Sequence, residues 1–103
     1  MTASRVRVPV PRDRIADFCR RHHIHRLAFF GSVLREDFTP NSDIDVLIDI
    51  DTTQTITLFT LARLQNDLGD LLGRPVDLHM PRTLNRYLRD KVLSEAEDVY
   101  VAA

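Results

Sequence analysis

The chain has 103 residues, a length that fits one small domain and leaves no room for a second. Hydrophobic residues make up 44% and charged residues 28%, which is typical of globular proteins and argues against a disordered chain. A net charge of −1 argues against binding to nucleic acid by bulk positive charge. No apolar run is long enough to span a membrane, the single cysteine excludes an intrachain disulfide, and the start lacks a secretory signal. A cytoplasmic protein is expected.

The first half of the chain predicts a helix and two strands. Residues 1–11 are basic and contain two prolines, which predicts an irregular N-terminal arm. Apolar and aromatic side chains then recur with the spacing i, i+3, i+4, i+7 from Ile15 to His22, the pattern of an amphipathic helix. The short apolar run 26–30 predicts a buried strand that stops at a glycine. Residues 31–43 are predicted to form a loop with room for one helical turn. Residues 44–50 are predicted to form a central strand.

The second half predicts two helices and two strands. After a turn at 51–54, the leucine spacing over 55–72 predicts a helix that ends at Gly73. Residues 75–79 are predicted to form a third strand and residues 99–101 a fourth. Thr83 is expected to cap the last helix between them. The helix face expected after that cap comprises Leu84, Tyr87, Leu88 and Val92. This order predicts an α/β or α+β domain over residues 1–103, with one mixed sheet of about four strands flanked by helices.

Three aspartates are the candidate catalytic and metal-binding residues. Asp43 and Asp45 stand two positions apart at the start of the central strand, so their side chains are expected on the same face. Two carboxylates so close need a cation to stay ionised, and an oxygen-only site favours Mg²⁺. Asp77 lies between apolar neighbours in the third strand and faces away from both, so it reaches the same cluster if the two strands are adjacent.

A glycine and a serine directly after the first strand form a candidate phosphate cradle. Gly31 lets the backbone approach a phosphate closely, and Ser32 offers a hydroxyl and an N–H at the start of the helical turn. The alternative for Ser32 is a helix N-cap. The joint pattern consists of Gly-Ser, ten further residues and then Asp-x-Asp. In chains of this composition, the pattern arises by chance roughly once in a thousand. The combination predicts metal-assisted nucleotidyl or phosphoryl transfer.

The segment GSVLREDFTPNSDIDVLI resembles the signature of the polymerase-β-like nucleotidyltransferases, and the whole chain resembles the minimal nucleotidyltransferases, or MNT proteins. The resemblance implies that Asp43, Asp45 and Asp77 hold two Mg²⁺ ions and that Asp77 helps to deprotonate the acceptor hydroxyl. It also implies that ATP is the nucleotide donor. The nucleotide-binding residues it implies are Gly31, Ser32 and Ser42. Arg35 is a further candidate for phosphate contact, because it lies inside the loop. The family loop usually has Arg-Gly after Ser-x-x, whereas here Glu36 follows the arginine.

The resemblance also implies a partner. MNT proteins are commonly encoded beside a helical HEPN toxin, often a ribonuclease, and act as its antitoxin. Some members transfer AMP to a tyrosine of the toxin. A hetero-oligomer with a HEPN protein is therefore expected, with no membrane and no direct nucleic-acid contact. A domain this small has little room for an acceptor pocket, which also points to an acceptor on another protein.

Two other functions stay open at this stage. The chain could neutralise a toxin by occlusion without catalysis, or it could be a transferase subunit acting on a small molecule.

Several other polar side chains have both a structural and a functional interpretation. His22, His23 and His25 lack the further ligands of a zinc site. His22 is expected on the apolar face of the first helix, and His23 and His25 at the helix end. His79 shares the strand face of Asp77 and could support the site. The arginines near the third strand and last helix form either a solvated surface or an electrostatic one for a partner or for phosphates; they are Arg74, Arg82, Arg86 and Arg89.

Overall fold

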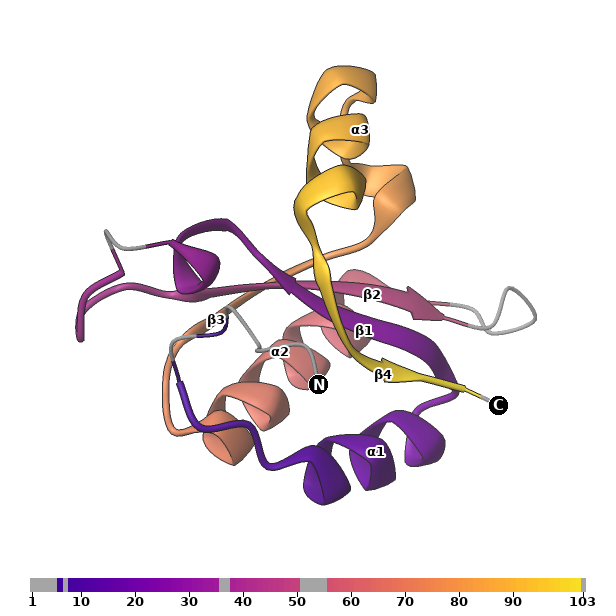
Figure 1. Cartoon of the computed structure of the whole chain (residues 1–103). Coiled ribbons are helices and arrows are strands. Elements are labelled where there is room, and N and C mark those ends of the chain that lie inside the picture. Colours follow the sequence, from indigo (N-terminus) through magenta and orange to yellow (C-terminus); the bar gives the residue numbers. More distant parts are fainter. Residues whose placement is uncertain (1–5, 7, 36–37, 51–55, 103) are drawn as a thin grey trace.

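The computed structural model describes residues 6, 8–35, 38–50 and 56–102. The sequence predictions that fall on Glu36, on the turn at 51–54 and on Thr55 lie outside the described residues. In the described part, three α-helices and a four-stranded mixed sheet follow one another in the expected order, which confirms the predicted fold class (Figure 1).

The sheet has the strand order β3-β2-β1-β4. The central strands β1 (Ile24–Phe30) and β2 (Ile44–Ile50) are antiparallel, and β4 (Glu97–Val101) is antiparallel to β1. The short strand β3 (Val76–His79) runs parallel to β2, with Ile44 opposite Val76. The predicted helical turn is a 3₁₀ turn, η1 (Gly31–Leu34), directly after β1.

Two helices cover one face of the sheet (Figure 1). The helix α1 (Arg12–Arg21) buries Ile15 and Phe18, and α2 (Leu58–Leu72) buries Leu64 and Leu68 against the apolar side of the strands. The Thr57 hydroxyl accepts a bond from the Thr60 N–H at the start of α2. Gly73 ends the helix in the left-handed conformation, as predicted.

The sequence predicts a stripe of buried leucines along α2, at positions 58, 61, 64, 68, 71 and 72, and this prediction is wrong for Leu58. Leu58 is 84% exposed at the first position of the helix. The remaining members of the stripe are buried or half-buried in the main core.

The last helix starts later than the sequence predicts. α3 (Arg86–Glu95) is capped by Asn85, whose side chain accepts from the Leu88 N–H, and not by Thr83. The Thr83 hydroxyl instead donates to the Met80 carbonyl oxygen at 2.8 Å and so closes a second 3₁₀ turn, η2 (Pro81–Thr83). The predicted buried face is wrong at Tyr87 and Leu88, which are 92% and 45% exposed, whereas Val92 is buried as predicted.

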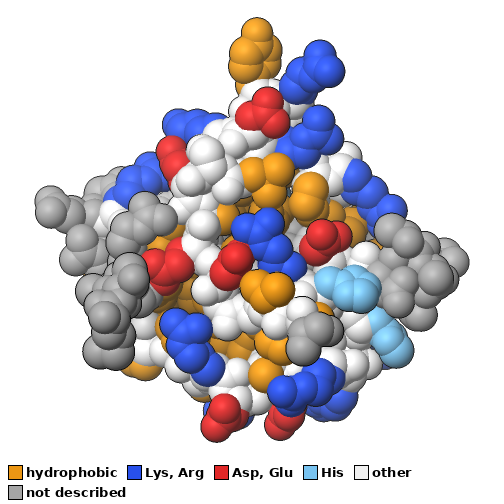
Figure 2. Space-filling model, turned by 45° about the vertical axis from the view of Figure 1, so that its right-hand side comes forward, with side chains coloured by type: hydrophobic (Ala, Val, Ile, Leu, Met, Phe, Trp, Pro, Cys, Tyr) orange, Lys and Arg blue, Asp and Glu red, His pale blue; other side chains and the backbone are white. Residues whose placement is uncertain are grey.

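α3 stands on the opposite face of the sheet from α1 and α2 (Figure 1). It contacts the sheet through Val92, which packs with Phe30 and Leu47 in a small second cluster. Basic side chains and a hydrophobic one gather at the top of the molecule, over this helix (Figure 2).

In the N-terminal arm, Val6, Val8 and Val10 pack against the main core. Among the residues described, none of the helices has the length and apolar character that a membrane span requires.

Candidate active site

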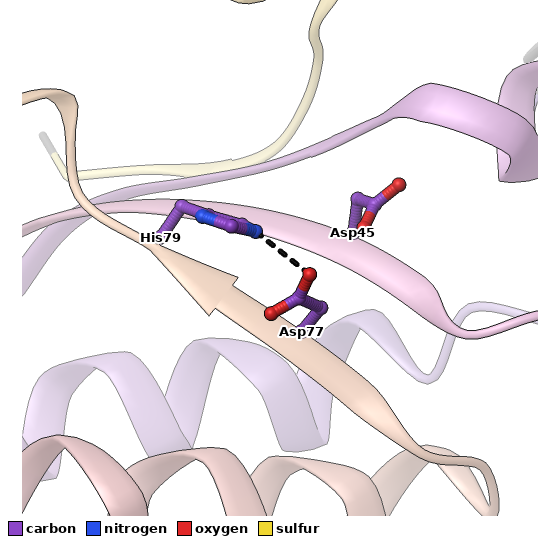
Figure 3. Close-up of side chains that lie close together, drawn as sticks. All are labelled: Asp45, Asp77 and His79. Atoms are coloured by element: carbon purple, nitrogen blue, oxygen red, sulfur yellow. Dashed lines mark ion pairs between the residues drawn. The ribbon is translucent and has the colours of Figure 1, made fainter. Parts of the chain in front are cut away.

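The site is built on the parallel pair of strands. Asp45 in β2 lies directly opposite Asp77 in β3, so the two side chains leave the same face of the sheet as neighbours (Figure 3). This is the face that carries α3, and the opposite face holds the main core. The sequence predicts that Asp77 joins the cluster if its strand neighbours that of Asp45, and the two strands are indeed adjacent.

Gly31 makes room for the Asp45 carboxylate. Phe30 pairs with Asp45 across the antiparallel strands, and the next residue, Gly31, turns away with φ +75°. A Cβ added to Gly31 would overlap Oδ2 of Asp45 and lie 3.1 Å from its Cγ. The glycine is thus required both by its left-handed backbone and by the close approach of the carboxylate.

His79 completes a compact group of potential metal ligands. One ligand atom each from Asp45, Asp77 and His79 lies within 4.8 Å of the others. The His79 Nε2 atom is 3.0 Å from Oδ2 of Asp77 (Figure 3). The imidazole ring packs edge-on against Phe30, with the ring centroids 5.5 Å apart. Sequence reasoning gave His79 only a supporting role, and its position two residues after Asp77 was the available signal.

The electrostatics of Asp45 fit a cation. Burial raises the pKa of Asp45, and the negative charge of Asp77 raises it further, as does that of Asp43. His79 and Arg35 lower the pKa of Asp45 and so oppose these effects. Oxygen donors gathered around a half-buried carboxylate with unbalanced negative charge suit a divalent ion such as Mg²⁺. The residues present therefore fit the metal that the family resemblance implies.

Asp43 lies one residue before β2 and is exposed. It stands outside the group formed by Asp45, Asp77 and His79, although its charge acts on Asp45. The adjacent Ser42 hydroxyl accepts a bond from the Thr39 N–H at 3.0 Å, and the Ser42 N–H donates to the Thr39 carbonyl oxygen. In this structure Ser42 thus closes the turn that leads to Asp43.

The other proposed nucleotide ligands lie on and beside η1. Ser32 is half-buried, and the N-cap position belongs to Phe30, so the alternative interpretation of Ser32 as an N-cap is wrong. The Arg35 N–H donates to the Ser32 carbonyl oxygen, and the Arg35 side chain is exposed and close enough to affect Asp45. Gly31 and Arg35 also line a hollow of about 200 Å³, together with Leu34 and Glu95.

Arg74 has a role that sequence reasoning missed. Its guanidinium lies over the Phe38 ring, 4.7 Å from the centroid, and its Nη1 atom donates to three carbonyl oxygens of the loop before Asp43. The chain pattern offered no signal, because the partners are backbone atoms more than 30 positions away. The other three arginines of the predicted cluster are exposed or half-buried around η2 and α3.

The histidines near the end of α1 have local contacts. The His22 ring packs on Phe18 with a centroid distance of 4.7 Å, and burial lowers the pKa of His22. His23 adopts a positive φ of 58° where the helix ends.

Comparison with known proteins gives the family. The family model described as "Nucleotidyltransferase domain" matches residues 12–99. A protein of Methanocaldococcus jannaschii, provisionally named a protein adenylyltransferase, is 33% identical over 86 residues, which cover 84% of this chain and 90% of the relative. The protein adenylyltransferase MntA of Thermococcus cleftensis is 33% identical over 81 residues, 79% of this chain and 78% of the relative.

Solved structures share the fold. A chain of a toxin–antitoxin crystal structure with AMP-PNP superposes with a TM-score of 0.74 at 21% identity, covering 90% of this chain and 75% of its own. A chain of the complex between tri-AMPylated Shewanella oneidensis HEPN toxin and MNT antitoxin gives a TM-score of 0.65 at 20% identity, with coverages of 88% and 70%. The family match includes every side chain of the site, and the chain therefore belongs to the nucleotidyltransferase domain family.

Proposed function

We propose that this nucleotidyltransferase is the antitoxin of a HEPN toxin. It transfers AMP from ATP to a tyrosine hydroxyl of the toxin and thereby neutralises it. The observation that carries the proposal is the pairing of Asp45 and Asp77 on adjacent strands, with Gly31 held against the Asp45 carboxylate. The relatives named protein adenylyltransferases support the reaction class. The reaction consumes ATP and would take place in the cytoplasm.

In the proposed reaction, the acceptor oxygen attacks the α-phosphorus of ATP. The bond from that phosphorus to the bridging oxygen of the β-phosphate breaks, and pyrophosphate leaves. The proton of the acceptor hydroxyl passes to the Asp77 carboxylate, which is about half exposed and can reach a group arriving from solvent. His79 Nε2 lies 3.0 Å from Oδ2 of this carboxylate and would orient it.

The aspartates would hold metal ions, and the remaining side chains would bind the nucleotide. Asp43, Asp45 and Asp77 would hold two Mg²⁺ ions, which when bound stabilise the negative charge of the transferred phosphate and of the leaving pyrophosphate. The backbone of Gly31 and the hydroxyl of Ser32 would contact the phosphates. Arg35 is exposed beside them and would add a positive charge, and Ser42 would contribute through the loop that carries Asp43.

A protein acceptor agrees with the exposed surface near the site. α3 stands on the same face of the sheet as the two aspartates and exposes Tyr87, Leu88 and Leu93. Exposed apolar side chains flanked by arginines are typical of a surface that binds another protein. The solved complex of an MNT antitoxin with an AMPylated HEPN toxin supports the choice of partner.

The test is a transfer assay with α-labelled ATP, Mg²⁺ and the product of the neighbouring gene, where the proposal expects a HEPN protein. We expect label on the HEPN protein, loss of its toxicity, and neither effect with Asp45→Asn or Asp77→Asn. Asp49→Asn is the matched control, because Asp49 is an exposed aspartate of the same strand outside the ligand group.

Each alternative gives a different result. A partner that is inhibited but carries no label would show that the chain acts by occlusion and not by catalysis. Label on a small hydroxylated compound and none on the partner would overturn the proposed acceptor.

A further inference from the structure

Arg74 connects the two strands of the site, and we propose that it is the positioning residue for Asp43. It would hold the loop before β2 so that the Asp43 carboxylate stays close enough for its charge to act on Asp45. This inference rests on the proposed function, because it assigns Asp43 to the same metal-binding group.

The base of Arg74 is fixed on both sides. Its N–H donates to the Gly69 carbonyl oxygen at 3.1 Å, which ties it to the end of α2. The next residue, Pro75, accepts the Ile44 N–H at 3.0 Å, and this bond starts the pairing of β2 with β3. The guanidinium therefore projects from a backbone that two elements of secondary structure hold in place.

The guanidinium reaches across to the loop that carries Asp43. Nη1 lies 3.3 Å from the Thr39 and Ser42 carbonyl oxygens and 3.4 Å from that of Pro40. The same group covers the ring of Phe38. One side chain thus contacts four of the five residues between Phe38 and Ser42, and Asp43 follows immediately.

These contacts require arginine rather than any cation. The planar guanidinium can stack on an aromatic ring and donate sideways from its edge, whereas the compact ammonium of lysine cannot do both. Because the guanidinium is engaged with carbonyl oxygens, its role in this structure differs from the phosphate-binding role open to the surface arginines. Residues that orient metal ligands in this way typically change metal affinity by about 10–100-fold when mutated.

Hydrogen exchange tests the loop without any metal. In the full chain, Arg74→Met should speed amide exchange at Phe38, Thr39 and Ser42 by about tenfold, because their intraloop bonds lose the clamp. These three amides donate to the Arg35 carbonyl oxygen, the Ser42 hydroxyl and the Thr39 carbonyl oxygen, respectively. Arg63→Met is the matched control on the exposed side of α2, and it should leave the loop unchanged.

Mn²⁺ binding, followed by electron paramagnetic resonance, tests the effect on the site. Arg74→Met should weaken Mn²⁺ binding about tenfold, and Arg74→Lys should fall between this variant and the wild type. Phe38→Leu gives a second, milder variant in case Arg74→Met does not fold, and it should shift both readouts in the same direction.

The outcomes separate this inference from the proposed function. Arg74→Met with wild-type loop exchange or wild-type Mn²⁺ affinity would overturn the positioning role while the metal site stands. Arg74→Lys indistinguishable from wild type would show that charge alone suffices and would also overturn it. Equal Mn²⁺ binding by the wild type and by Asp45→Asn would remove the metal site itself.

Discussion

Gly31 and Asp45 are packed so closely that a single methyl group on Gly31 would overlap the Asp45 carboxylate. Their contact joins the end of β1 to the face of β2 that carries the candidate metal ligand Asp45. It also gives the Gly-Ser part of the sequence signature a structural reason that is independent of phosphate binding.

Gly31→Ala should therefore disrupt the site and the fold together. Alanine at φ +75° is strained, and its Cβ would displace the carboxylate, so we expect a loss of about 2–4 kcal/mol in unfolding free energy and at least tenfold weaker Mn²⁺ binding. Gly73→Ala is the matched control, since Gly73 has φ +71° and nothing within 4 Å of an added Cβ. It should cost about 1 kcal/mol and spare the metal site. Equal Mn²⁺ affinities for the two variants would contradict the prediction.

Asp45→Asn should separate stability from activity. Burial and the charge of Asp77 disfavour the ionised Asp45, so the neutral amide should melt at a higher temperature than the wild type at pH 7 without metal. Transfer activity should fall at least about a hundredfold, because the amide is a poor ligand for a divalent cation. Calorimetry and the labelling assay on the same sample provide the two readouts. A variant that melts lower than Asp49→Asn would refute the electrostatic part.

The raised pKa of Asp45 also predicts how metal-free stability depends on pH. The folded state binds this proton more tightly than the unfolded state, so the contribution is fully present below the unfolded pKa of about 3.8 and is lost as the pH rises through the folded value. Divalent cations should reverse the trend, because they bind the ionised form. We expect melting curves with and without Mn²⁺ to diverge as the pH rises above 4 and to coincide in Asp45→Asn. Divergence that persists in this variant would point to another binding site.

Val92→Ala should release α3 from the sheet. Val92 is the buried residue of this helix and fills the contact with Phe30 and Leu47. Removing two methyl groups should cost about 1.5–3 kcal/mol in urea unfolding and speed hydrogen exchange throughout α3. Leu93→Ala, one position along, removes a more exposed side chain and should cost less. If the two variants are equally stable, the small cluster does not anchor the helix.

Tyr87→Ser should weaken partner binding without changing the fold. Tyr87 is 92% exposed, so the melting temperature should stay close to that of the wild type, whereas affinity for the HEPN protein should fall about tenfold or more. Phe59→Ser is the control, because Phe59 is 90% exposed on α2, on the other side of the sheet. Isothermal titration of the partner measures both. Weaker binding with Phe59→Ser and not with Tyr87→Ser would move the interface to the α2 side.

The sequence predicts the parts of this molecule that depend on local patterns. The strand of Asp45 and the helix ending at Gly73 appear where the spacing of apolar residues and the glycine predicted them. The start of α3 was misplaced because both Thr83 and Asn85 are good capping residues, and only the 3₁₀ turn that occupies Thr83 decides between them.

Contacts between distant segments could be predicted only in part. The pairing of Asp45 with Asp77 followed from the strand assignments once the two strands were taken as neighbours. The clamp by Arg74 could not be predicted, because hydrogen bonds to backbone carbonyl oxygens depend on the path of a loop and leave no mark on its side-chain pattern.

The parallel pairing of β2 with β3 has a consequence for the order in which the enzyme forms. Strands that pair in this way are joined by a crossover, here the whole of α2, and closing so long a connection is an unfavourable, late event. Asp45 and Asp77 can therefore meet only once the chain through Asp77 has folded back beside β2. A nascent chain that has not yet released β3 from the ribosome carries only one of the two aspartates, so adenylyl transfer would begin only when synthesis of the domain is nearly complete.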